Sequence, residues 1–405
     1  MAAKKVKKER EPYITGVHLK NIRGFEDLEL GFEQEGNPRM RTLIIGQNGT
    51  GKTTILRCIA LAIADFPGAV GLMQLPNGSL TLPNDPGHVE LRMSTGAGFY
   101  MDIPGSYASP QSHKTGQDDL RHQFVVGYGI NRSRVGKSRA ESRGDEYRVS
   151  DSVLSLFDPD ALLTSSELTL RRLKDYLNEP VYYKALRGLT KVFNLPEGSQ
   201  IDFAKGGGVQ ITAPGVGENI PLEGWADGHR QTFQWIMDFY GWAMRAEALT
   251  EDGGVKGILL IDEIEQHLHP SQQLTLMNRL SELFPELQII ATTHSPLVAL
   301  GVEPHELIAL KRQGDAVVAV RPPDYRTYSV EDLIKDDLLF DTPVYSPKMQ
   351  QSLSEYQSLA ARGPKTRSAK QNKALAQLAQ EIAPASDEND PVLQEIRKLR
   401  EELKK

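Results

Sequence analysis

The sequence predicts an α/β fold with a mainly parallel core sheet, an N-terminal antiparallel edge sheet and a short helical insertion. The core is indicated by three short, continuously apolar segments bounded by polar turns, at residues 42–45, 257–261 and 288–292. Strands that are buried on both faces of a parallel sheet have this pattern. Helical periodicity follows at Thr53–Ala64 and Ser271–Phe284. An alternation of strand, loop and helix is typical of α/β proteins.

The edge sheet is indicated by short strand-like segments. Leu28, Leu30 and Phe32 alternate with polar residues at the period of two expected for half-buried strands. Residues 66–125 are rich in Gly and Pro and contain further strand-like pieces. We therefore expect an antiparallel sheet beside the core, and a hairpin at residues 307–320 that closes the core.

The helical insertion is predicted between the two halves of the core. Residues 164–193 have a helical pattern, with Ser165 or Ser166 as the N-cap and a break near Pro180, where the ring removes a backbone donor. Residues 201–212 are a hairpin candidate that turns on three glycines.

These patterns divide the chain into four predicted segments. Residues 1–130 form the first half of the core with a glycine-rich loop, and residues 131–220 form a basic loop and the insertion. Residues 221–345 form the second half of the core, and residues 346–405 form a tail that we expect to bind a partner. The tail ends in an apolar stripe of about two heptads, too short to stand alone in water. The stripe consists of Val392, Ile396, Leu399 and Leu403.

Composition favours an ordinary globular protein with a large core: of 405 residues, 39% are hydrophobic and 25% are charged. The net charge of -6 provides no global positive field for nucleic acid. A single cysteine, Cys58, excludes an internal disulfide and fits a reducing compartment. The basic N-terminus lacks the apolar region of a secretory signal, and no apolar run approaches the roughly 20 residues of a membrane span. We expect a cytoplasmic protein without membrane contact.

The strongest motif is "GQNGTGKT", which matches G-x-x-x-x-G-K-S/T directly after an apolar strand and before a helix. Its glycines allow successive backbone N–H groups to face phosphates. Lys52 would reach the β- and γ-phosphates, and Thr53 would bind Mg²⁺. The alternative, a glycine turn that merely caps a helix, is disfavoured by the flanking strand and helix. The candidate nucleotide-binding residues are Gly46, Gln47, Asn48, Gly49, Thr50, Gly51, Lys52, Thr53 and Thr54.

Two acids, Asp262 and Glu263, end the second apolar strand. Burying them is costly unless a cation receives them. Asp262 fits a magnesium ligand, together with Thr53, and Glu263 fits the group that polarises the attacking water. The alternative is that both acids end the strand in solvent. His267 and His269 are weak metal-ligand candidates because no Cys or His cluster accompanies them, and we prefer a turn that shapes a subunit contact.

His294 follows the third apolar strand. Ligands of open α/β sheets bind at the carboxyl ends of the strands, so this position favours a γ-phosphate sensor. A histidine with only a structural role in the turn is the alternative.

Together, "GQNGTGKT", "LLIDEIEQHLHP", "ATTHSP" and "LKNIRGFEDLEL" resemble the ABC-type P-loop ATPase heads of the SMC, RecF and OLD class. The resemblance covers about residues 13–310. It implies ATP and Mg²⁺ as cofactors, Glu263 and His294 as catalytic residues, and a homo-oligomer in which ATP joins two heads. In this class, a signature loop from the second subunit completes each nucleotide site.

The segment "WADGHRQ" lies where the resemblance places the signature loop, with Ala226, Asp227 and Gly228 as the candidate residues. Gly228 matches a signature glycine, and the helix behind it would point its positive end at the neighbour's γ-phosphate. The sequence departs from the family at Ala226, where a serine is usual. The missing hydroxyl removes a charge-assisted hydrogen bond of about 1.5–3 kcal/mol, so we expect slow turnover.

"FVVGYGINRSR" and "VLSLFDPDALL" resemble the compact ATPases of bacterial phage-defence modules, such as Septu-type, retron-associated and OLD-like systems. This resemblance implies a separate effector, a nuclease or toxin. The chain after Gly301 is short for a fused Toprim nuclease, so we expect none, and we interpret the acidic stretch at residues 331–341 as a solvated face rather than a metal site.

A candidate DNA contact is the basic loop that contains Arg132, Arg134, Lys137, Arg139 and Arg143. A solvated charged loop is the plainer alternative. Two other functional classes stay open at this stage: a RecF-like DNA repair and recombination ATPase, and an interaction scaffold with a nearly silent ATP site.

Overall fold

In the computed structural model, the chain forms two compact units. The first contains the residues up to 333 together with 338–340, and the second contains 334–337 and the residues from 341 onward. The described residues are 12–78, 80, 86–103, 111–115, 123–136, 146–205, 207–363 and 366–382, with only the backbone described for 111–115.

The core of the first unit is a six-stranded sheet in the order β16-β15-β5-β14-β13-β9. Neighbouring strands from β9 to β15 pair in parallel, and β16 joins β15 as an antiparallel hairpin. The predicted mainly parallel core and closing hairpin are therefore confirmed. The strands are β5 (Arg41–Gly46), β9 (Val125–Tyr128), β13 (Gly257–Ile261), β14 (Leu287–Thr292), β15 (Leu307–Gln313) and β16 (Ala316–Val320).

The predicted antiparallel edge sheet is also present, with the strand order β2-β1-β6-β7-β8. Within residues 66–125, the first eight form helix α2 (Phe66–Met73) rather than a strand, because Asp65 is the N-cap and Pro67 lies in the first turn. The strands are β1 (Ile14–Ile22), β2 (Phe25–Gly31), β6 (Gly87–Met93), β7 (Gly98–Ile103) and β8 (Gln111–Thr115), with a short ribbon of β3 (Glu33–Gln34) and β4 (Asn37–Pro38).

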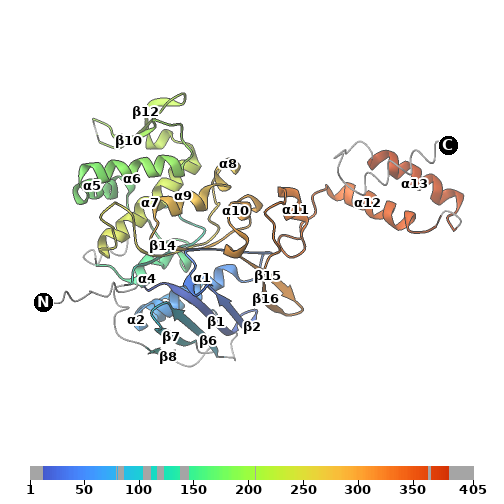
Figure 1. Ribbon diagram of the computed structural model, residues 1–405, viewed down its shortest axis with the longest axis horizontal. Coiled ribbons are helices and arrows are strands. Elements are labelled where there is room, and N and C mark those ends of the chain that lie inside the picture. The colour runs from blue at the N-terminus through green and yellow to red at the C-terminus, as the bar shows by residue number, and fades with distance from the viewer. Residues whose placement is uncertain are drawn as a thin grey trace. The chain divides into compact units, whose positions relative to one another are not determined.

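Helix α1 (Lys52–Ile63) lies between the two sheets (Figure 1). Ten of its twelve residues are buried, as expected for a helix that is covered on both sides. Its residues share one hydrophobic cluster with Ile44, Ile258 and Ile290 of the core sheet and Val89 of the edge sheet. This packing fixes the start of α1 at the carboxyl end of β5.

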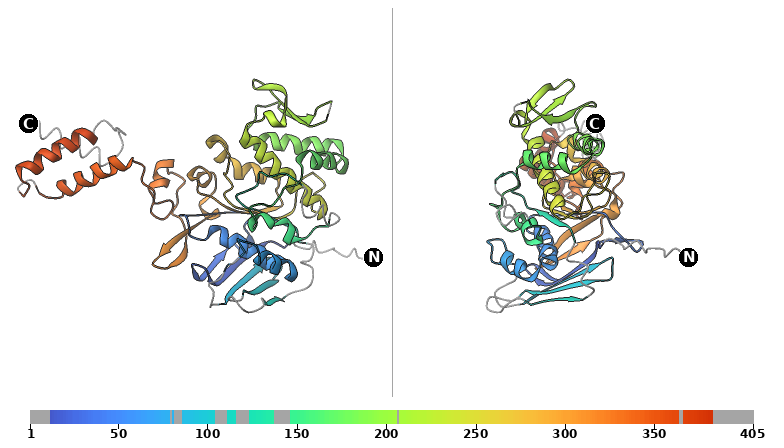
Figure 2. Two further views of the ribbon diagram at one scale, coloured as in Figure 1. Left: turned by 180° about the vertical axis from the view of Figure 1, so that it is seen from behind. Right: turned by 90° about the vertical axis from the view of Figure 1, so that its left-hand side faces the viewer.

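Helices of the insertion, together with α7 and α9 (Leu276–Leu283), cover the other face of the core sheet (Figure 1). The predicted break near Pro180 is confirmed, because Ser165 and Asn178 cap two successive helices with their side chains. The three-stranded sheet β10-β11-β12 lies beyond α5 and α6, away from the core sheet (Figure 2). These elements are α5 (Ser166–Tyr176), α6 (Glu179–Val192), β10 (Gln200–Phe203), β11 (Val209–Ala213), β12 (Gly217–Pro221) and α7 (Asp227–Arg245).

The helical pattern predicted over Ser271–Phe284 is present, but it is divided into two helices, α8 (Pro270–Gln273) and α9 (Leu276–Leu283). The backbone N–H of Thr275 bonds to the carbonyl of Gln272, three residues back, which tightens the turn and interrupts the helical pattern. Leu274, at this interruption, is 43% exposed.

The remaining helices among the described residues are short or lie in the second unit. In that unit, α12 and α13 pack around Tyr356, Leu375, Ala379 and Ile382. The predicted C-terminal apolar stripe lies outside the described residues. Among the described helices, none combines the length and hydropathy of a membrane-spanning segment. The helices are α4 (Val149–Ser152), α10 (Pro296–Leu300), α11 (Val330–Lys335), α12 (Pro347–Ala360) and α13 (Ala369–Ile382).

A buried glutamine, Gln288 on β14, joins the core sheet to the start of the edge sheet. Its side chain accepts from the N–H of Ile14 at 2.8 Å and donates to the carbonyls of Ile14 at 2.8 Å and Arg39 at 2.9 Å. Gln288→Met leaves these backbone groups without partners, so we expect the free energy of unfolding to fall by about 2–3 kcal/mol. Urea unfolding followed by tryptophan fluorescence measures this change, because all three tryptophans lie in the first unit.

The matched control is Gln210→Met on β11, where the glutamine side chain makes a surface hydrogen bond to Asn219. We expect this substitution to change stability by less than about 0.5 kcal/mol. Equal effects of the two substitutions would contradict the role assigned to Gln288.

Candidate functional site

The glycine-rich loop runs from the end of β5 to the start of α1. Gly51 is the N-cap of α1 and has a φ of 88°, in the left-handed region that favours glycine. A Cβ at this position would also lie 2.4 Å from the ring of Phe25. The close approach of β2 to the loop therefore requires glycine at residue 51.

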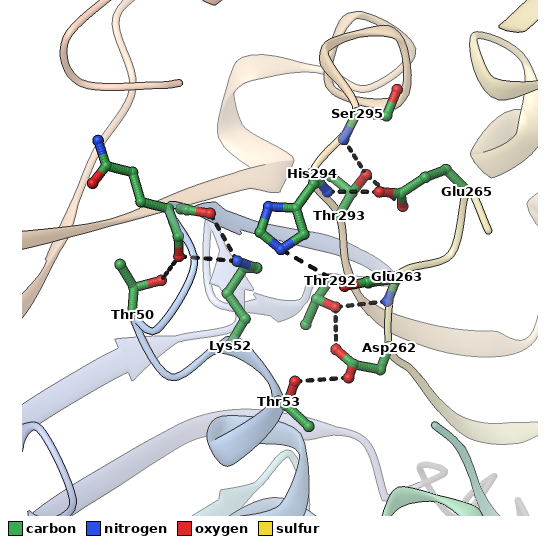
Figure 3. Close-up of polar contacts among 12 residues, drawn as sticks. Thr50, Lys52, Thr53, Asp262, Glu263, Glu265, Thr292, Thr293, His294 and Ser295 are labelled. Carbon is green, nitrogen blue, oxygen red and sulfur yellow. Dashed lines mark hydrogen bonds and ion pairs between the residues drawn. The ribbon is translucent and has the colours of Figure 1, made fainter. Parts of the chain in front are cut away.

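Lys52 curls back over this loop. Its Nζ donates to the carbonyls of Gly46 at 2.7 Å and Gln47 at 3.2 Å (Figure 3). Thr50 closes the same turn, since its hydroxyl donates to the Gln47 carbonyl at 2.8 Å. Burial lowers the pKa of Lys52 to about 8, although the nearby carboxylate of Asp262 favours the charged form.

Asp262 connects the ends of three elements. One oxygen of its buried carboxylate accepts from the hydroxyl of Thr53, in the first turn of α1, at 2.7 Å. The other accepts from the hydroxyl of Thr292 at the end of β14. The Thr292 oxygen in turn accepts from the backbone N–H of Glu263 at 2.8 Å. The loop, the acidic pair and the third strand thus form one hydrogen-bonded network (Figure 3).

The Thr53 hydroxyl and the Asp262 carboxylate fit a magnesium site. Both supply oxygen, and Mg²⁺ is usually bound by one or two protein groups together with phosphates and water. No cluster of three or more His, Cys, Asp or Glu side chains suited to a metal occurs within the described ranges. The structure gives His269 another role, since its Nδ1 accepts from the backbone N–H of Ser271 and caps α8.

Glu263 and His294 face each other across the site, with 3.8 Å between Oε1 of Glu263 and Nε2 of His294 (Figure 3). Burial, reinforced by the neighbouring carboxylates of Asp262 and Glu265, raises the pKa of Glu263. Burial and the Lys52 ammonium lower the pKa of His294. A lowered histidine pKa favours the neutral ring, so at neutral pH one ring nitrogen of His294 donates and the other accepts.

Glu265 positions the segment that carries His294. Its two carboxylate oxygens accept from the hydroxyl of Thr293 at 2.6 Å and from the backbone N–H of His294 at 2.7 Å. Sequence analysis missed the roles of Glu265 and Thr292. The available signals were an acid two residues after Glu263 and a hydroxyl at the end of the third strand.

A cavity of about 330 Å³ brings most of the predicted site together. Gly46 and Gln47 contribute the carbonyls that hold Lys52 rather than side chains in the lining. The basic residues Arg23, at the turn between β1 and β2, and Arg57 of α1 also line the cavity and were not among the candidates. With Lys52, they place three cationic side chains around it, which suits a polyanionic ligand. The predicted residues in the lining are Asn48, Gly49, Thr50, Gly51, Lys52, Thr53, Thr54, Asp262, Glu263 and His294.

The prediction that Arg132 belongs to an exposed basic loop is wrong. Arg132 is only 3% exposed, and its guanidinium donates to the carbonyls of Asp262 and Glu263. Buried guanidinium groups need such partners, which explains why the side chain turns inward. Arg134 is exposed and forms an ion pair with Asp160. The other basic residues of this loop, Lys137, Arg139 and Arg143, lie outside the described residues.

The candidate signature residues do not reach this cavity within one chain. Ala226 is the N-cap of α7 without a side-chain hydrogen bond, and Asp227 forms a surface ion pair with Arg230 at 2.6 Å. A Cβ on Gly228 would lie 2.1 Å from the carbonyl oxygen of His267. Among the described residues that line the cavity, none belongs to 226–228. Close packing inside one chain is therefore a sufficient reason for glycine at residue 228.

We expect Gly228→Ala to lower the free energy of unfolding by about 1–3 kcal/mol, because the new methyl group forces α7 away from the backbone at His267. Chemical denaturation followed by tryptophan fluorescence measures the change. Gly71→Ala in α2 is the control, since nothing lies within 4 Å of its Cβ position. We expect that substitution to be neutral or stabilising. An unaffected Gly228→Ala protein would argue against the packing role.

The chain is similar to several known proteins. The family described as "AAA domain, putative AbiEii toxin, Type IV TA system" matches residues 41–300. Septu protein PtuA from Bacillus mycoides (strain KBAB4) is 24% identical over 362 residues, which cover 82% of this chain and 46% of that protein. The retron Vc95 probable ATPase from Vibrio cholerae serotype O1 biovar El Tor is 34% identical over 110 residues, which cover 26% of this chain and 21% of that protein. The aligned stretches thus span less than half the length of either relative.

Among solved structures, the SMC head domain from Thermotoga maritima has a TM-score of 0.46 and 15% sequence identity, over 77% of this chain and 99% of that one. The family match covers more than half of the chain and includes the glycine-rich loop, the acidic pair and His294. The chain therefore belongs to the family described as "AAA domain, putative AbiEii toxin, Type IV TA system", and the matched residues 41–300 lie in its first unit.

Proposed function

We propose that this chain binds and hydrolyses ATP, forms a dimer of heads when ATP is bound, and controls a separate effector in bacterial antiviral defence. The observation that carries the proposal is the meeting of Lys52, the Thr53–Asp262 pair, Glu263 and His294 around one cavity. These groups can bind phosphates, hold a divalent cation and direct a water molecule.

In this proposal, the triphosphate lies along the N–H groups of the loop and at the start of α1, where the helix dipole favours negative charge. When ATP binds, the Lys52 ammonium replaces its hydrogen bonds to the carbonyls of Gly46 and Gln47 with hydrogen bonds to phosphate oxygens. Thr53 and Asp262 would hold the magnesium ion, which neutralises phosphate charge when bound.

Glu263 would accept a hydrogen bond from the attacking water and orient it toward the γ-phosphate. His294, which is neutral because its pKa is lowered, would donate a hydrogen bond to that phosphate. The Glu265 bond to its backbone N–H anchors the main chain of His294.

Dimerisation is proposed from the signature candidates. Ala226, Asp227 and Gly228 begin the 19-residue helix α7, whose N-terminus carries partial positive charge. Since they do not line the cavity of their own chain, we assign them to the cavity of a second copy. The absence of a serine hydroxyl at Ala226 supports slow turnover, because the phosphate loses one donor.

An effector, a nuclease or toxin, is proposed as the separate partner. Support comes from the similarity to a Septu protein PtuA and to probable ATPases of retrons. We place its binding site on residues 346–405. In the described part of this tail, α12 and α13 bury only a small cluster around Tyr356 and Ile382.

Two substitutions test the ATP site. Lys52→Ala removes the phosphate contact, so we expect ATP affinity to fall at least tenfold. Glu263→Gln keeps the shape of the site but cannot act as a base, so we expect turnover to fall by about 10²-fold or more while ATP binding persists. Because unhydrolysed ATP joins the heads in this proposal, the Glu263→Gln protein should accumulate as a dimer in the presence of ATP and Mg²⁺. Light scattering measures the dimer.

Lys20→Ala on the exposed part of β1 and Glu282→Gln on the surface of α9 are the matched controls, and both should behave as the unmodified protein. Normal ATP binding by Lys52→Ala would show that the site is wrongly assigned. A monomeric Glu263→Gln protein in saturating ATP would reject ATP-driven dimerisation.

The lowered pKa of Lys52 predicts pH-dependent ATP binding. The ammonium group of the free protein is charged below a pKa of about 8 and loses its charge as the pH rises through that value. We therefore expect the Kd for ATP to rise about tenfold between pH 7 and pH 9, as measured by isothermal titration calorimetry. In Lys52→Arg, the guanidinium stays protonated, so the Kd should change little over this range. Parallel pH profiles for the two proteins would contradict this explanation.

A further inference from the structure

Arg132 is a buried cation whose hydrogen bonds all reach main-chain carbonyls. Its Nη1 donates to the carbonyls of Gly129 at 3.0 Å and Asp262 at 2.7 Å, and its Nη2 donates to the carbonyl of Glu263 at 2.6 Å. The side chain is 3% exposed. Burial lowers the pKa of Arg132 to about 10, so the guanidinium remains charged at neutral pH.

The main chain that Arg132 holds has an unusual conformation. Glu263 has a φ of 44°, in the left-handed region that residues with a Cβ rarely adopt. Such a conformation persists only when the surrounding contacts impose it. At this position, the contacts come from both sides of the residue.

On one side, the hydroxyl of Thr292 accepts from the N–H of Glu263 at 2.8 Å, and the carbonyl of Thr292 accepts from the N–H of Ile264 at 3.0 Å. On the other side, the two Nη atoms of the Arg132 guanidinium donate to the successive carbonyls of Asp262 and Glu263. Together, these bonds fix both peptide planes around Glu263, and its carboxylate then points at His294 (Figure 3).

The segment that carries Arg132 is itself anchored. The N–H of Gly129 donates to the hydroxyl of Ser155 at 3.1 Å, and that hydroxyl donates to the carbonyl of Gly127 at 3.0 Å. A Cβ on Gly129 would lie 2.1 Å from the carbonyl oxygen of Ser155. The guanidinium of Arg132 therefore projects from an anchored turn that follows β9. Strand β9 in turn pairs with β13.

We propose that Arg132 is a positioning residue for ATP hydrolysis: its fork holds the peptides of Asp262 and Glu263 so that the Glu263 carboxylate faces the γ-phosphate position. This inference rests on the proposed function. Arg132 does not itself line the cavity, and its bonds reach only the main-chain carbonyls of Gly129, Asp262 and Glu263, so its effect should appear in kcat and not in nucleotide affinity.

The test compares Arg132→Gln, Arg132→Lys and the control Arg134→Gln, which changes an exposed arginine of the same segment. We expect Arg132→Gln to lower kcat at least tenfold while the Kd for ATP changes less than threefold. Arg132→Lys keeps the charge but loses the fork, so it should recover part of the rate. Arg134→Gln should leave both parameters unchanged.

The same substitutions are then made in Glu263→Gln. If Arg132 acts through the Glu263 carboxylate, its loss lowers the residual rate less than twofold in this background. An equal fold-loss of kcat in both backgrounds, or a parallel loss of ATP affinity, would overturn the proposal. If Arg132→Gln does not fold, Arg132→Lys is measured in both backgrounds and judged by the same criterion.

A crystal structure of the folded variant decides the question without turnover. We expect Glu263 to leave the left-handed region and its carboxylate to move away from His294. An unchanged Glu263 conformation would overturn the positioning role even if the unmodified protein hydrolyses ATP. Conversely, a displaced Glu263 in a protein that never hydrolyses ATP would reject the proposed function and keep the positional role of Arg132.

Discussion

The buried carboxylate of Asp262 is the group on which the rest of the site depends. Its oxygens accept from Thr53 on α1 and Thr292 on β14, and Asp262 itself directly follows β13. A buried charge of this kind is tolerated only with hydrogen bonds and nearby cations. Lys52 and Arg132 provide the nearby positive charge. Helix α1 and the strands β13 and β14 are thereby joined at the carboxyl ends of the core strands.

The same arrangement separates the tasks of two adjacent acids. Asp262 is enclosed and already hydrogen-bonded, which suits a fixed ligand, whereas Glu263 is partly exposed and faces His294 across a short gap. The backbone of Glu263 is in the left-handed region, so the chain departs from the extended conformation of β13 at this residue. The Glu263 side chain then faces His294. The chemistry proposed for Glu263 therefore depends on backbone geometry as much as on the residue type.

The segment after Glu263 also connects the site to α7. Gly228 packs on the carbonyl of His267, and the amide of Gln272 donates to the ring of His229 at 2.6 Å. The start of α7 and the turn that follows Glu263 are thus packed together. A second copy that contacts residues 226–228 would act on this turn directly, which offers a physical route between head association and hydrolysis.

The sequence by itself determined the α/β class, the parallel core, the glycine-rich loop and the acidic pair, because each depends on neighbouring residues whose pattern is local. Only the tertiary structure decided the contacts that join distant segments. It turned Arg132 inward, although a basic residue among others gives no sign of its direction. It paired Thr292 with Asp262 across 30 residues and interrupted the helix at Leu274. These outcomes depend on which backbone carbonyls and hydroxyls lie nearby, and the folded sheet alone brings them together.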